Sequence, residues 1–539
     1  MKNDEILNLN DEVKSLIEDD QLQKASTHEC DHEHKDEKYV NVTPYMGGDF
    51  TGVTFRYVYG KAKLTGLPTS QAIKSRARYA SLLALASFVR NPKSFKEVYH
   101  AFSVSLEEVP EIPLIGLIYG CVNCSKSVEA FASPFKLAVS VEAEEGDLRW
   151  FCPPAYKKHK KCYDRYHALL SKTKDKDKTR SNELMPAKPF SIHLRVTTYM
   201  EKERLKLLDL SEDIINHMNC IFNMSIEFAL LVLGIGKATS RGFGRFWKEK
   251  DLQKNLPTCE NITDTITNFV EAWKKLIEQL DKEGYLNINI ARNRVSYENP
   301  ISDILNGNVP HLGFLYKLAE KKTLCRDPYM KADAGNVNVK IEKIAEAVLK
   351  STWKRIDGNS RSSGVPYHTW PLGLPRKSKI RCTCDISDSQ NIYGYLLAPK
   401  SKQNFCENFC AGHKTPTRDL RRVSMLHLMP LKEGILILPL LSRDLEKYMK
   451  PNSKYKLYHV GGHFVYRKPC CNRHFVAVDF IFKNKVIKAP SGSVVGCGCG
   501  RDEGGIKVPG DVSAITRPKN EYEKALIAAI LWVHRALSE

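Results

Sequence analysis

Four glycines and three cations fall within one short segment, Gly234-Ile235-Gly236-Lys237-Ala238-Thr239-Ser240-Arg241-Gly242-Phe243-Gly244-Arg245-Phe246. Glycine lets backbone amides approach a ligand that a Cβ atom would hold away. The interleaved cations make a phosphate chain the expected ligand, and the two phenylalanines offer flat faces on which a base could stack. The alternative interpretation is a tight glycine connector between a helix and a strand.

The residues before this segment predict which structure precedes it. Apolar side chains recur at helical spacing over 214–233, so the glycine segment is expected to follow a helix. In a P-loop or a dinucleotide fingerprint the glycines instead follow a strand and open a helix. The Gly-Lys-Ser/Thr ending of a P-loop is also missing, which argues against nucleotide hydrolysis.

The charge of the chain favours a polyanionic partner. Its 539 residues include 82 Lys and Arg against 62 Asp and Glu, a formal net charge of +20. Residues 1–38 hold 12 acidic and 5 basic side chains, so this arm carries −7 and the remainder +27. The acidic arm is expected to be solvated, and masking of the basic body in the absence of RNA is a second possibility.

Targeting signals are missing from the sequence. No basic start followed by an apolar core marks a secretory signal, and no apolar run approaches the roughly 20 residues of a membrane span. A cytoplasmic location without a membrane partner is therefore expected. The 16 cysteines are then interpreted as metal ligands, buried thiols or disulfides of the kind found in hyperthermophiles.

One cysteine group has the residues for a structural zinc site. Cys121 and Cys124 are spaced to bind one tetrahedral metal ion, and Cys152 and Cys162 could complete four thiolates. The ten-residue spacing of the second pair is looser than in a zinc ribbon. One structural zinc ion and a disulfide or buried-thiol assignment therefore both stay open.

No catalytic constellation is evident. The sequence holds no serine elbow, no His-Glu-x-x-His and no pair of carboxylates at useful spacing. Asp49 is interpreted as a turn-capping aspartate. Metal-independent cleavage would need a histidine near the glycine segment as general acid or base, and His193 and His217 are the nearest in sequence.

The chain divides into four predicted regions. These are the acidic arm 1–38, an N-terminal domain 39–250 with a basic, Cys-containing insertion at about 110–185, a helical connecting region 251–360, and a β-rich C-terminal domain 361–539. Helices are predicted over 70–89, 214–233, 262–280, 341–356 and 521–537. Strands are predicted over 39–43, 54–64, 190–200, 392–397, 423–431, 434–440, 455–460 and 475–482.

Four motifs together resemble the RAMP superfamily of CRISPR effector proteins, and more narrowly the large subunit that caps the head end of type III-B (Cmr) complexes. In chain order they are Thr43-Pro44-Tyr45-Met46-Gly47-Gly48-Asp49, then Ala72-Ile73-Lys74-Ser75-Arg76-Ala77-Arg78, then the glycine segment, then Gly373-Leu374-Pro375 with Arg422-Val423-Ser424-Met425-Leu426. They span residues 40–440. Ser75 stands where the family usually has glycine, and the aromatic pair that follows in the family is missing. The acidic arm, the basic insertion and the cysteines are departures on which the resemblance is silent.

The resemblance implies an α+β fold with two ferredoxin-like (RRM-type) RAMP units carrying helical and Cys-containing insertions. It also implies binding of single-stranded RNA through backbone charge and stacking, with sequence left to base pairing. On this basis the expected RNA contacts are Gly47, Gly48, Lys74, Arg76, Arg78, Gly236, Lys237, Arg241, Gly242, Phe243, Gly244 and Arg245.

The resemblance therefore predicts a non-catalytic subunit of a type III-B effector. Its expected partners are the 3′ region of the guide RNA, the target RNA, and other RAMP and small subunits. Two alternatives remain open: a metal-independent endoribonuclease that matures guide RNA, and a generic zinc-containing RNA-binding protein.

Overall fold

The computed structural model describes residues 37–45, 57–58, 61–62, 68–106, 111–125, 128–142, 148–149, 185–186, 190–198, 210–236, 239–251, 256–348, 352–353, 356, 369–373, 376–379, 391–399, 424–449, 453, 455–461, 474–477, 515 and 518–539. All of them belong to one compact unit, His34–Glu539. Residues 1–36 of the acidic arm and most of the basic insertion lie outside the described residues. Within the described part, no helix is long and apolar enough to cross a membrane.

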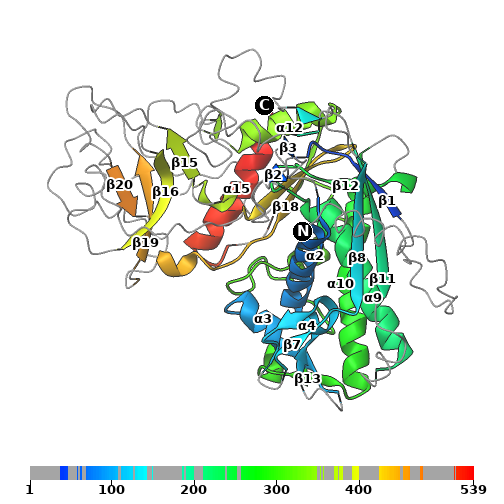
Figure 1. Ribbon diagram of the computed structural model, residues 1–539. Coiled ribbons are helices and arrows are strands. Elements are labelled where there is room, and N and C mark those ends of the chain that lie inside the picture. The colour runs from blue at the N-terminus through cyan, green and yellow to red at the C-terminus, as the bar shows by residue number, and fades with distance from the viewer. Residues whose placement is uncertain are drawn as a thin grey trace. The chain divides into compact units, whose positions relative to one another are not determined.

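A four-stranded antiparallel sheet organises the N-terminal half (Figure 1). Its strands are β1 (Glu37–Asn41), β8 (Phe135–Glu142), β11 (Ser191–Thr198) and β12 (Phe246–Lys248), in the spatial order β12-β1-β11-β8. Helix α2 (Ser70–Leu85) lies between β1 and β8 in the chain, and α9 (Glu212–Phe228) between β11 and β12. Leaving insertions aside, the chain order is strand, helix, strand, strand, helix, strand.

Residue alternation sets the two faces of this sheet. Tyr39 is in register with Ile192, and both side chains are buried in the core that contains α2 and α9. The neighbouring pair, Lys38 and His193, points to the opposite face because successive side chains of a strand alternate.

Helices with clear start signals cover the sheet. Thr69 caps α2 by accepting a hydrogen bond from the Ala72 amide, and its buried residues recur at helical spacing. Helix α10 (Cys259–Lys282) begins with a capping box formed by Thr258 and Asn261, and it packs against α2 and α9. The helices predicted over 70–89, 214–233 and 262–280 are confirmed, the first as α2 followed by a 3-10 turn, η2 (Ala86–Phe88).

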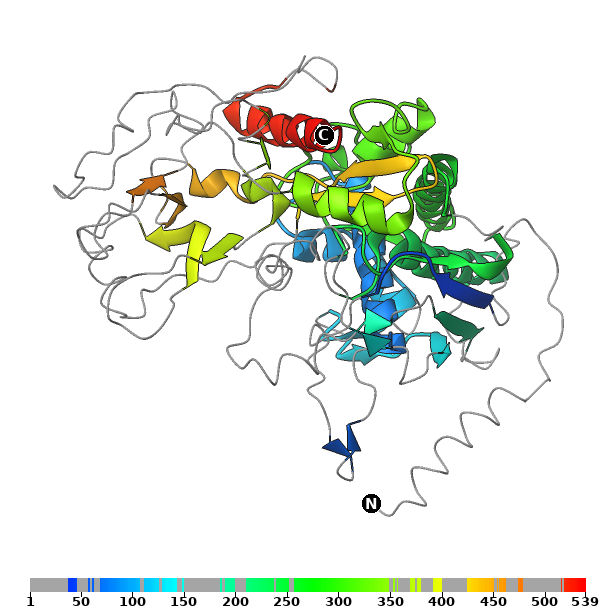
Figure 2. The same cartoon turned by 90° about the horizontal axis from the view of Figure 1, so that it is seen from above.

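A second antiparallel sheet lies in the C-terminal half, in the order β14-β18-β17. Its strands are β14 (Met330–Ala332), β17 (Leu426–Pro430) and β18 (Gly434–Pro439). Helix α12 (Val337–Ala347) packs on β17 and α15 (Glu521–Ala536) on β18, and the two helices lie side by side (Figure 2). The predicted helix 341–356 begins earlier than expected, because Asn336 caps α12, which runs from Val337 to Ala347. Near the predicted end, the described residues Thr352, Trp353 and Ile356 are also helical.

Smaller elements complete the described chain. A three-stranded sheet, β13-β4-β5, joins β13 (Leu286–Ile288), β4 (Phe102–Val104) and β5 (Ile112–Pro113). A four-stranded sheet runs β15-β16-β19-β20, from β15 (Arg376–Lys379), β16 (Asn391–Pro399), β19 (Tyr455–Gly461) and β20 (His474–Ala477). Strand pairs are β2 (Tyr57–Val58) with β3 (Lys61–Ala62), β6 (Cys121–Val122) with β7 (Ala130–Phe131), and β9 (Leu148–Arg149) with β10 (Met185–Pro186). The short helices are α3 (Phe95–Ala101), α4 (Leu114–Tyr119), α11 (Gly313–Glu320), η4 (Ala229–Leu233), η5 (Glu249–Asp251), η6 (Arg292–Arg294), η7 (Trp370–Leu372) and η8 (Glu446–Tyr448).

Two apolar cores underlie this arrangement. The larger one joins the first sheet to α2, α9 and α10, and the smaller one joins α12 and α15 to β17 and β18. Helices and antiparallel sheets alternate irregularly along the chain, so the fold class is α+β, as the sequence predicted.

Candidate nucleic-acid interface

The glycine loop follows a helix, as the sequence predicted. Helix α9 continues into a π-helical turn, η4, which ends at Gly234 with a φ of 73°. The last carbonyls of a helix have no partner within the helix. The wider π turn is a local irregularity of a kind that often occurs at functional sites. The loop therefore starts with carbonyl groups that another part of the chain must satisfy.

Arg245 satisfies one of these carbonyls from inside the protein. Its side chain is fully buried, and its two Nη atoms donate to the Leu231 carbonyl at 3.2 Å and the Thr239 carbonyl at 2.9 Å. The guanidinium thus links the end of η4 to the middle of the loop. Its planar fork suits two fixed acceptors.

Arg76 of α2 holds the same loop from the other side. It donates from Nη2 to the Leu233 carbonyl and the Thr239 hydroxyl, both at 3.1 Å, and from Nε to the Gly234 carbonyl at 3.2 Å. Two arginines, 169 residues apart in the chain, therefore meet at one threonine.

Helix-end carbonyls take the place of carboxylates around this pair. Among the described residues, no carboxylate forms an ion pair with either guanidinium. Burial lowers the pKa of Arg245 to about 9, with the charge of Arg76 as the second cause. Burial also lowers the pKa of Arg76. The negative end of the α9–η4 helix dipole partly offsets both charges, and the remaining positive potential lies directly under the loop.

The end of β1 fixes the other side of the loop. The Thr43 hydroxyl accepts from the Arg245 amide at 2.9 Å, and the Pro44 carbonyl accepts from the Gly244 amide at 2.9 Å. Asn41 adds a bond from its side-chain amide to the Arg245 carbonyl at 3.1 Å. The Thr-Pro motif is therefore a support for the glycine loop. Its members were not predicted as site residues, although the motif that contains Thr43 and Pro44 was a signal for them.

The loop also reaches the C-terminal half. Phe243 is 4% exposed and belongs to the smaller core, and the Leu428 amide of β17 donates to the Ser240 carbonyl at 2.9 Å. Arg241 forms an isolated parallel bridge with Leu428. The glycine loop is thus built by both halves of the chain.

Close packing explains why glycine is needed at position 244. Its φ is 68°, and a Cβ atom there would lie 1.8 Å from the carbonyl oxygen of Ile235. That carbonyl belongs to the opposite side of the loop, so any side chain would force the two sides apart.

The three cations predicted on α2 point in different directions. Lys74 and Arg78 are one turn apart, about 40° around the axis, whereas Arg76 lies about 160° from either. Lys74 donates from Nζ to the Phe135 carbonyl at 3.3 Å, and Arg78 lies over the Tyr99 ring at 5.1 Å. Both side chains are half-buried and keep further donors for a ligand.

Several residues predicted to contact RNA are buried or bonded within the protein. Arg245 and Phe243 are buried, so neither a phosphate contact nor a stacking face is presented by them. Arg76 donates from Nε and Nη2 to two carbonyls at the end of the helix and to the Thr239 hydroxyl. The Gly242 amide donates to the Thr239 carbonyl and the Gly244 amide to the Pro44 carbonyl. Gly236 is exposed and Arg241, Lys74 and Arg78 are half-buried, and their contact with RNA stays a prediction. Gly47, Gly48 and Lys237 lie outside the described residues.

The cysteines predicted for zinc are partly described. Cys121 and Cys124 form a disulfide with an S–S distance of 2.00 Å, and Cys152 and Cys162 lie outside the described residues. A second disulfide, not predicted, joins Cys259 at the start of α10 to Cys325. No group of metal-binding side chains occurs within the described ranges. The structure of the pair thus corresponds to the disulfide alternative, and zinc remains a prediction.

The histidines proposed for catalysis are engaged elsewhere. His193 pairs with Glu142 at 2.6 Å on the open sheet face, and His217 contacts Gln279 at 2.5 Å. A histidine that the sequence analysis missed, His427 of β17, lies under the loop. Burial, together with the charges of Arg76 and Arg245, lowers its pKa well below the usual value. The His427 side chain is 2% exposed, and the lowered pKa keeps its ring neutral.

No family model and no curated protein matches the sequence. The chain is similar in structure to Cmr1 from Pyrococcus furiosus, with 12% identity, a TM-score of 0.31, and coverage of 60% of this chain and 74% of that one. It is also similar to a chain of the type III-B Cmr-beta complex bound to cognate target RNA, with 13% identity, a TM-score of 0.33, and coverage of 75% and 94%. The similarity to Cmr6 from Pyrococcus furiosus has 15% identity, a TM-score of 0.18, and coverage of 40% of this chain and 96% of that one. At these TM-scores, function has to be argued from the residues of this chain.

Proposed function

We propose that the chain is a non-catalytic, RNA-binding RAMP subunit of a type III-B CRISPR (Cmr) effector. One observation carries the proposal. Three sequence motifs, separated by up to about 200 residues, meet at the glycine loop through Thr43, Arg76 and Arg245. The fourth motif leads into β17, which bonds to the same loop through Leu428. Segments that carry the resemblance to RAMP proteins thus contact one another at the glycine loop.

The strand orders support two ferredoxin-like units. Numbered along the chain, the first sheet has the order 4-1-3-2, with one helix after its first strand and one after its third. The second sheet has the order 1-3-2, with α12 and α15 in the same two positions. We interpret both as the split β-α-β arrangement, the second with three described strands.

The loop suits a phosphate backbone better than a base. Its aromatic side chains are buried, whereas Gly236 is exposed and Arg241 is half-buried. A positive potential with little hydrogen-bonding specificity binds any sequence. In an effector, base pairing with the guide would supply the sequence specificity. Binding near the 3′ region of the guide, with a role in target capture, is the finer part of the proposal.

Sequencing the RNA that co-purifies with the tagged chain tests this function. Short RNAs that share a 5′ repeat-derived tag and arrive with other RAMP subunits are expected. Heterogeneous RNA, unprocessed precursor or no RNA would contradict the effector assignment. Heterogeneous RNA would instead favour a generic RNA-binding protein.

The endoribonuclease alternative has one specific candidate in His427. This imidazole lies beneath the glycine loop, and its Nδ1 atom has no hydrogen-bond partner among the described residues. Its burial separates it from any RNA bound on the loop, so we expect no cleavage. Cleavage of repeat RNA by the wild type, lost in His427→Asn while binding persists, would establish the nuclease.

A further inference from the structure

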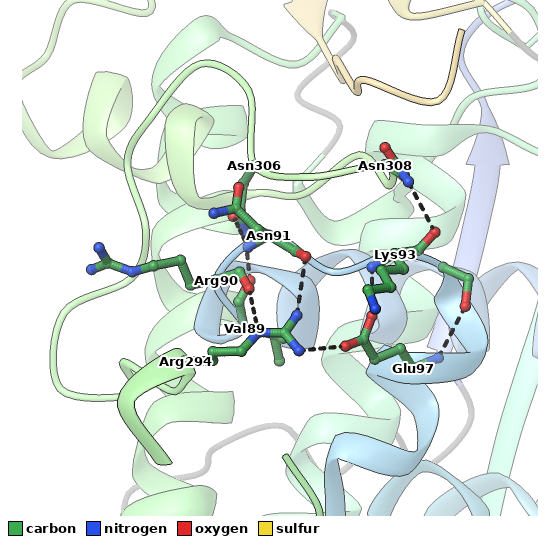
Figure 3. A network of polar contacts seen from close by, with 9 residues as sticks. Val89, Arg90, Asn91, Lys93, Glu97, Arg294, Asn306 and Asn308 are labelled. Carbon is green, nitrogen blue, oxygen red and sulfur yellow. Dashed lines mark hydrogen bonds and ion pairs between the residues drawn. The ribbon is translucent and has the colours of Figure 1, made fainter. Parts of the chain in front are cut away.

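A surface turn far from the glycine loop is held unusually firmly. It comprises residues 90–93 and joins η2 to α3. Side chains from 294–308, some 200 residues later in the chain, bind its backbone (Figure 3). Polar side chains within a turn commonly bond the backbone of that same turn. Here side chains from a distant part of the chain bind the turn, so its backbone is held in one conformation.

Arg294 donates two hydrogen bonds to backbone carbonyls of the turn. Nε donates to the Arg90 carbonyl at 3.1 Å, and Nη2 to the Asn91 carbonyl at 3.0 Å. Nη1 forms an ion pair with Glu97 at 2.6 Å. Glu97 is also occupied by the Lys93 amide at 2.5 Å. The acidic group at this turn is therefore used to hold its backbone.

Asn306 also holds the backbone of this turn (Figure 3). Its buried side chain accepts from the Asn91 amide at 2.8 Å and donates to the Ala86 and Val89 carbonyls at 3.0 and 2.7 Å. Asn91 has a φ of 52°, a left-handed conformation that asparagine tolerates better than most residues. With both Asn306 and Arg294 engaged, the turn has little freedom left.

The turn carries exposed positive charge. Arg90 and Lys93 are both exposed, and the Lys93 charge also acts on Glu97, which Arg294 already pairs. Figure 3 shows the Arg90 side chain directed away from the network. Exposed Lys96 and Arg292 lie on the segments that flank the turn and its support. Cations on a preorganised backbone bind a polyanion with less loss of conformational entropy than cations on a mobile loop.

We propose that the turn 90–93 is a second phosphate-binding surface for single-stranded RNA. This inference rests on the proposed RNA-binding function. Fourteen residues of α2 and its continuation separate Arg76 from Arg90, and at 1.5 Å per residue this is about 20 Å. The turn therefore contacts different phosphates from the glycine loop, and Arg78 lies on the helix between Arg76 and the turn. Two such sites on one strand strengthen binding through their effective concentration.

The test measures the affinity of the full chain for a single-stranded RNA as a function of salt. The variant is Arg90→Ala with Lys93→Ala, and the matched control is Arg535→Ala with Lys275→Ala, which removes one exposed Arg and one exposed Lys on α15 and α10. Each phosphate contact to a single strand contributes about 0.7 to the slope of log K against log salt. The variant is expected to lose about 1.4 from that slope, or about 25-fold in affinity at 0.1 M salt if affinity at 1 M is unchanged.

Each outcome separates the two proposals. If the wild type binds RNA and the turn variant keeps its affinity and slope, the second surface is disproved while the proposed function stands. If the wild type binds no RNA, the proposed function itself fails. An equal loss in the control variant would show a general charge effect and would also overturn the inference. Unchanged melting temperatures confirm folding, and Arg90→Glu with Lys93→Glu should deepen the loss.

Discussion

Arg76 and Arg245 both donate to Thr239, one to its hydroxyl at 3.1 Å and the other to its carbonyl at 2.9 Å. The two guanidinium groups hold one residue of the glycine loop from two sides. Each guanidinium group also donates a hydrogen bond to a carbonyl of η4, Arg76 to Leu233 and Arg245 to Leu231. Like charges so close are tolerated because these carbonyls, rather than carboxylates, surround them. The pair therefore supports the glycine loop from inside the protein.

Removing this buried support should weaken RNA binding without removing a phosphate contact. Arg245→Gln leaves the Leu231 or Thr239 carbonyl without its donor, at about 1–3 kcal/mol for each unsatisfied group. RNA affinity should fall because the loop loses its shape, while the salt slope stays near that of the wild type. Arg241→Gln is the matched control, with an expected slope loss of about 0.7 and little loss of stability. Denaturant unfolding and a salt titration of RNA binding provide the two measurements.

The reverse pattern would contradict this division of roles. Suppose that Arg245→Gln lowers the slope of log K against log salt by about 0.7 and leaves the free energy of unfolding unchanged. This result would mean that Arg245 contacts phosphate in solution.

A methyl group at position 244 should disrupt the loop. Gly244→Ala places a Cβ atom 1.8 Å from the Ile235 carbonyl oxygen, so the backbone has to move. Gly284→Ala is the control, because Gly284 also has a positive φ, of 81°, but has no atom within 4 Å of such a Cβ. The control isolates the cost of the left-handed conformation, about 1 kcal/mol. Gly244→Ala should cost several times more in the free energy of unfolding and should lose RNA affinity.

Equal costs for the two alanine variants would show that the loop relaxes freely. Position 244 would then need glycine only for its backbone angle.

The sequence predicted the helices, most strands and the position of the glycine loop because these depend on local patterns. Helical spacing over 214–233 and the turn chemistry of Gly234 are readable along the chain. The sequence did not reveal which cations hold the loop and which could contact RNA. Arg76 bonds Thr239, which is 163 residues away, and Arg245 bonds the same residue. His427 was missed for the same reason. Its strand pattern indicates only a buried position, and the nearby arginines come from other segments.

The two described disulfides should differ in their contribution to stability. The Cys259–Cys325 bond closes a loop of 66 residues and the Cys121–Cys124 bond one of 3. Loop entropy then gives about 4 kcal/mol for the first and less than about 2 kcal/mol for the second. Replacing each pair with alanine, under non-reducing conditions, should lower the free energy of unfolding in that order.

The same preparation tests the zinc prediction. Metal analysis combined with a count of free thiols distinguishes the two states of Cys121 and Cys124. One zinc ion per chain, released when this pair is replaced, would establish a thiolate site with Cys152 and Cys162 as the expected further ligands. Absence of zinc together with two fewer free thiols after denaturation would establish the disulfide.

Buried neutral histidines should make the protein less stable in acid. Burial lowers the pKa of His311 to about 4, and the Gly313 amide donates to its Nδ1 atom, which requires the unprotonated ring. In the unfolded chain the same group titrates near its ordinary value of about 6.5. Between these values the unfolded state binds more protons, so stability falls as pH falls from about 6.5 to 4 and this contribution is constant outside that window. At about 1.4 kcal/mol per pKa unit, His311 accounts for roughly 3 kcal/mol. His427 acts in the same direction.

Comparing the wild type with His311→Gln isolates this contribution, because carboxylates that titrate in the same window contribute equally to both proteins. The variant should be less stable at pH 7, where it lacks the native ring, but its stability should fall by about 3 kcal/mol less between pH 7 and 4. Denaturant unfolding at several pH values gives both curves. Parallel curves would mean that His311 is accessible to protons in the folded state, and that its burial is relieved by local opening.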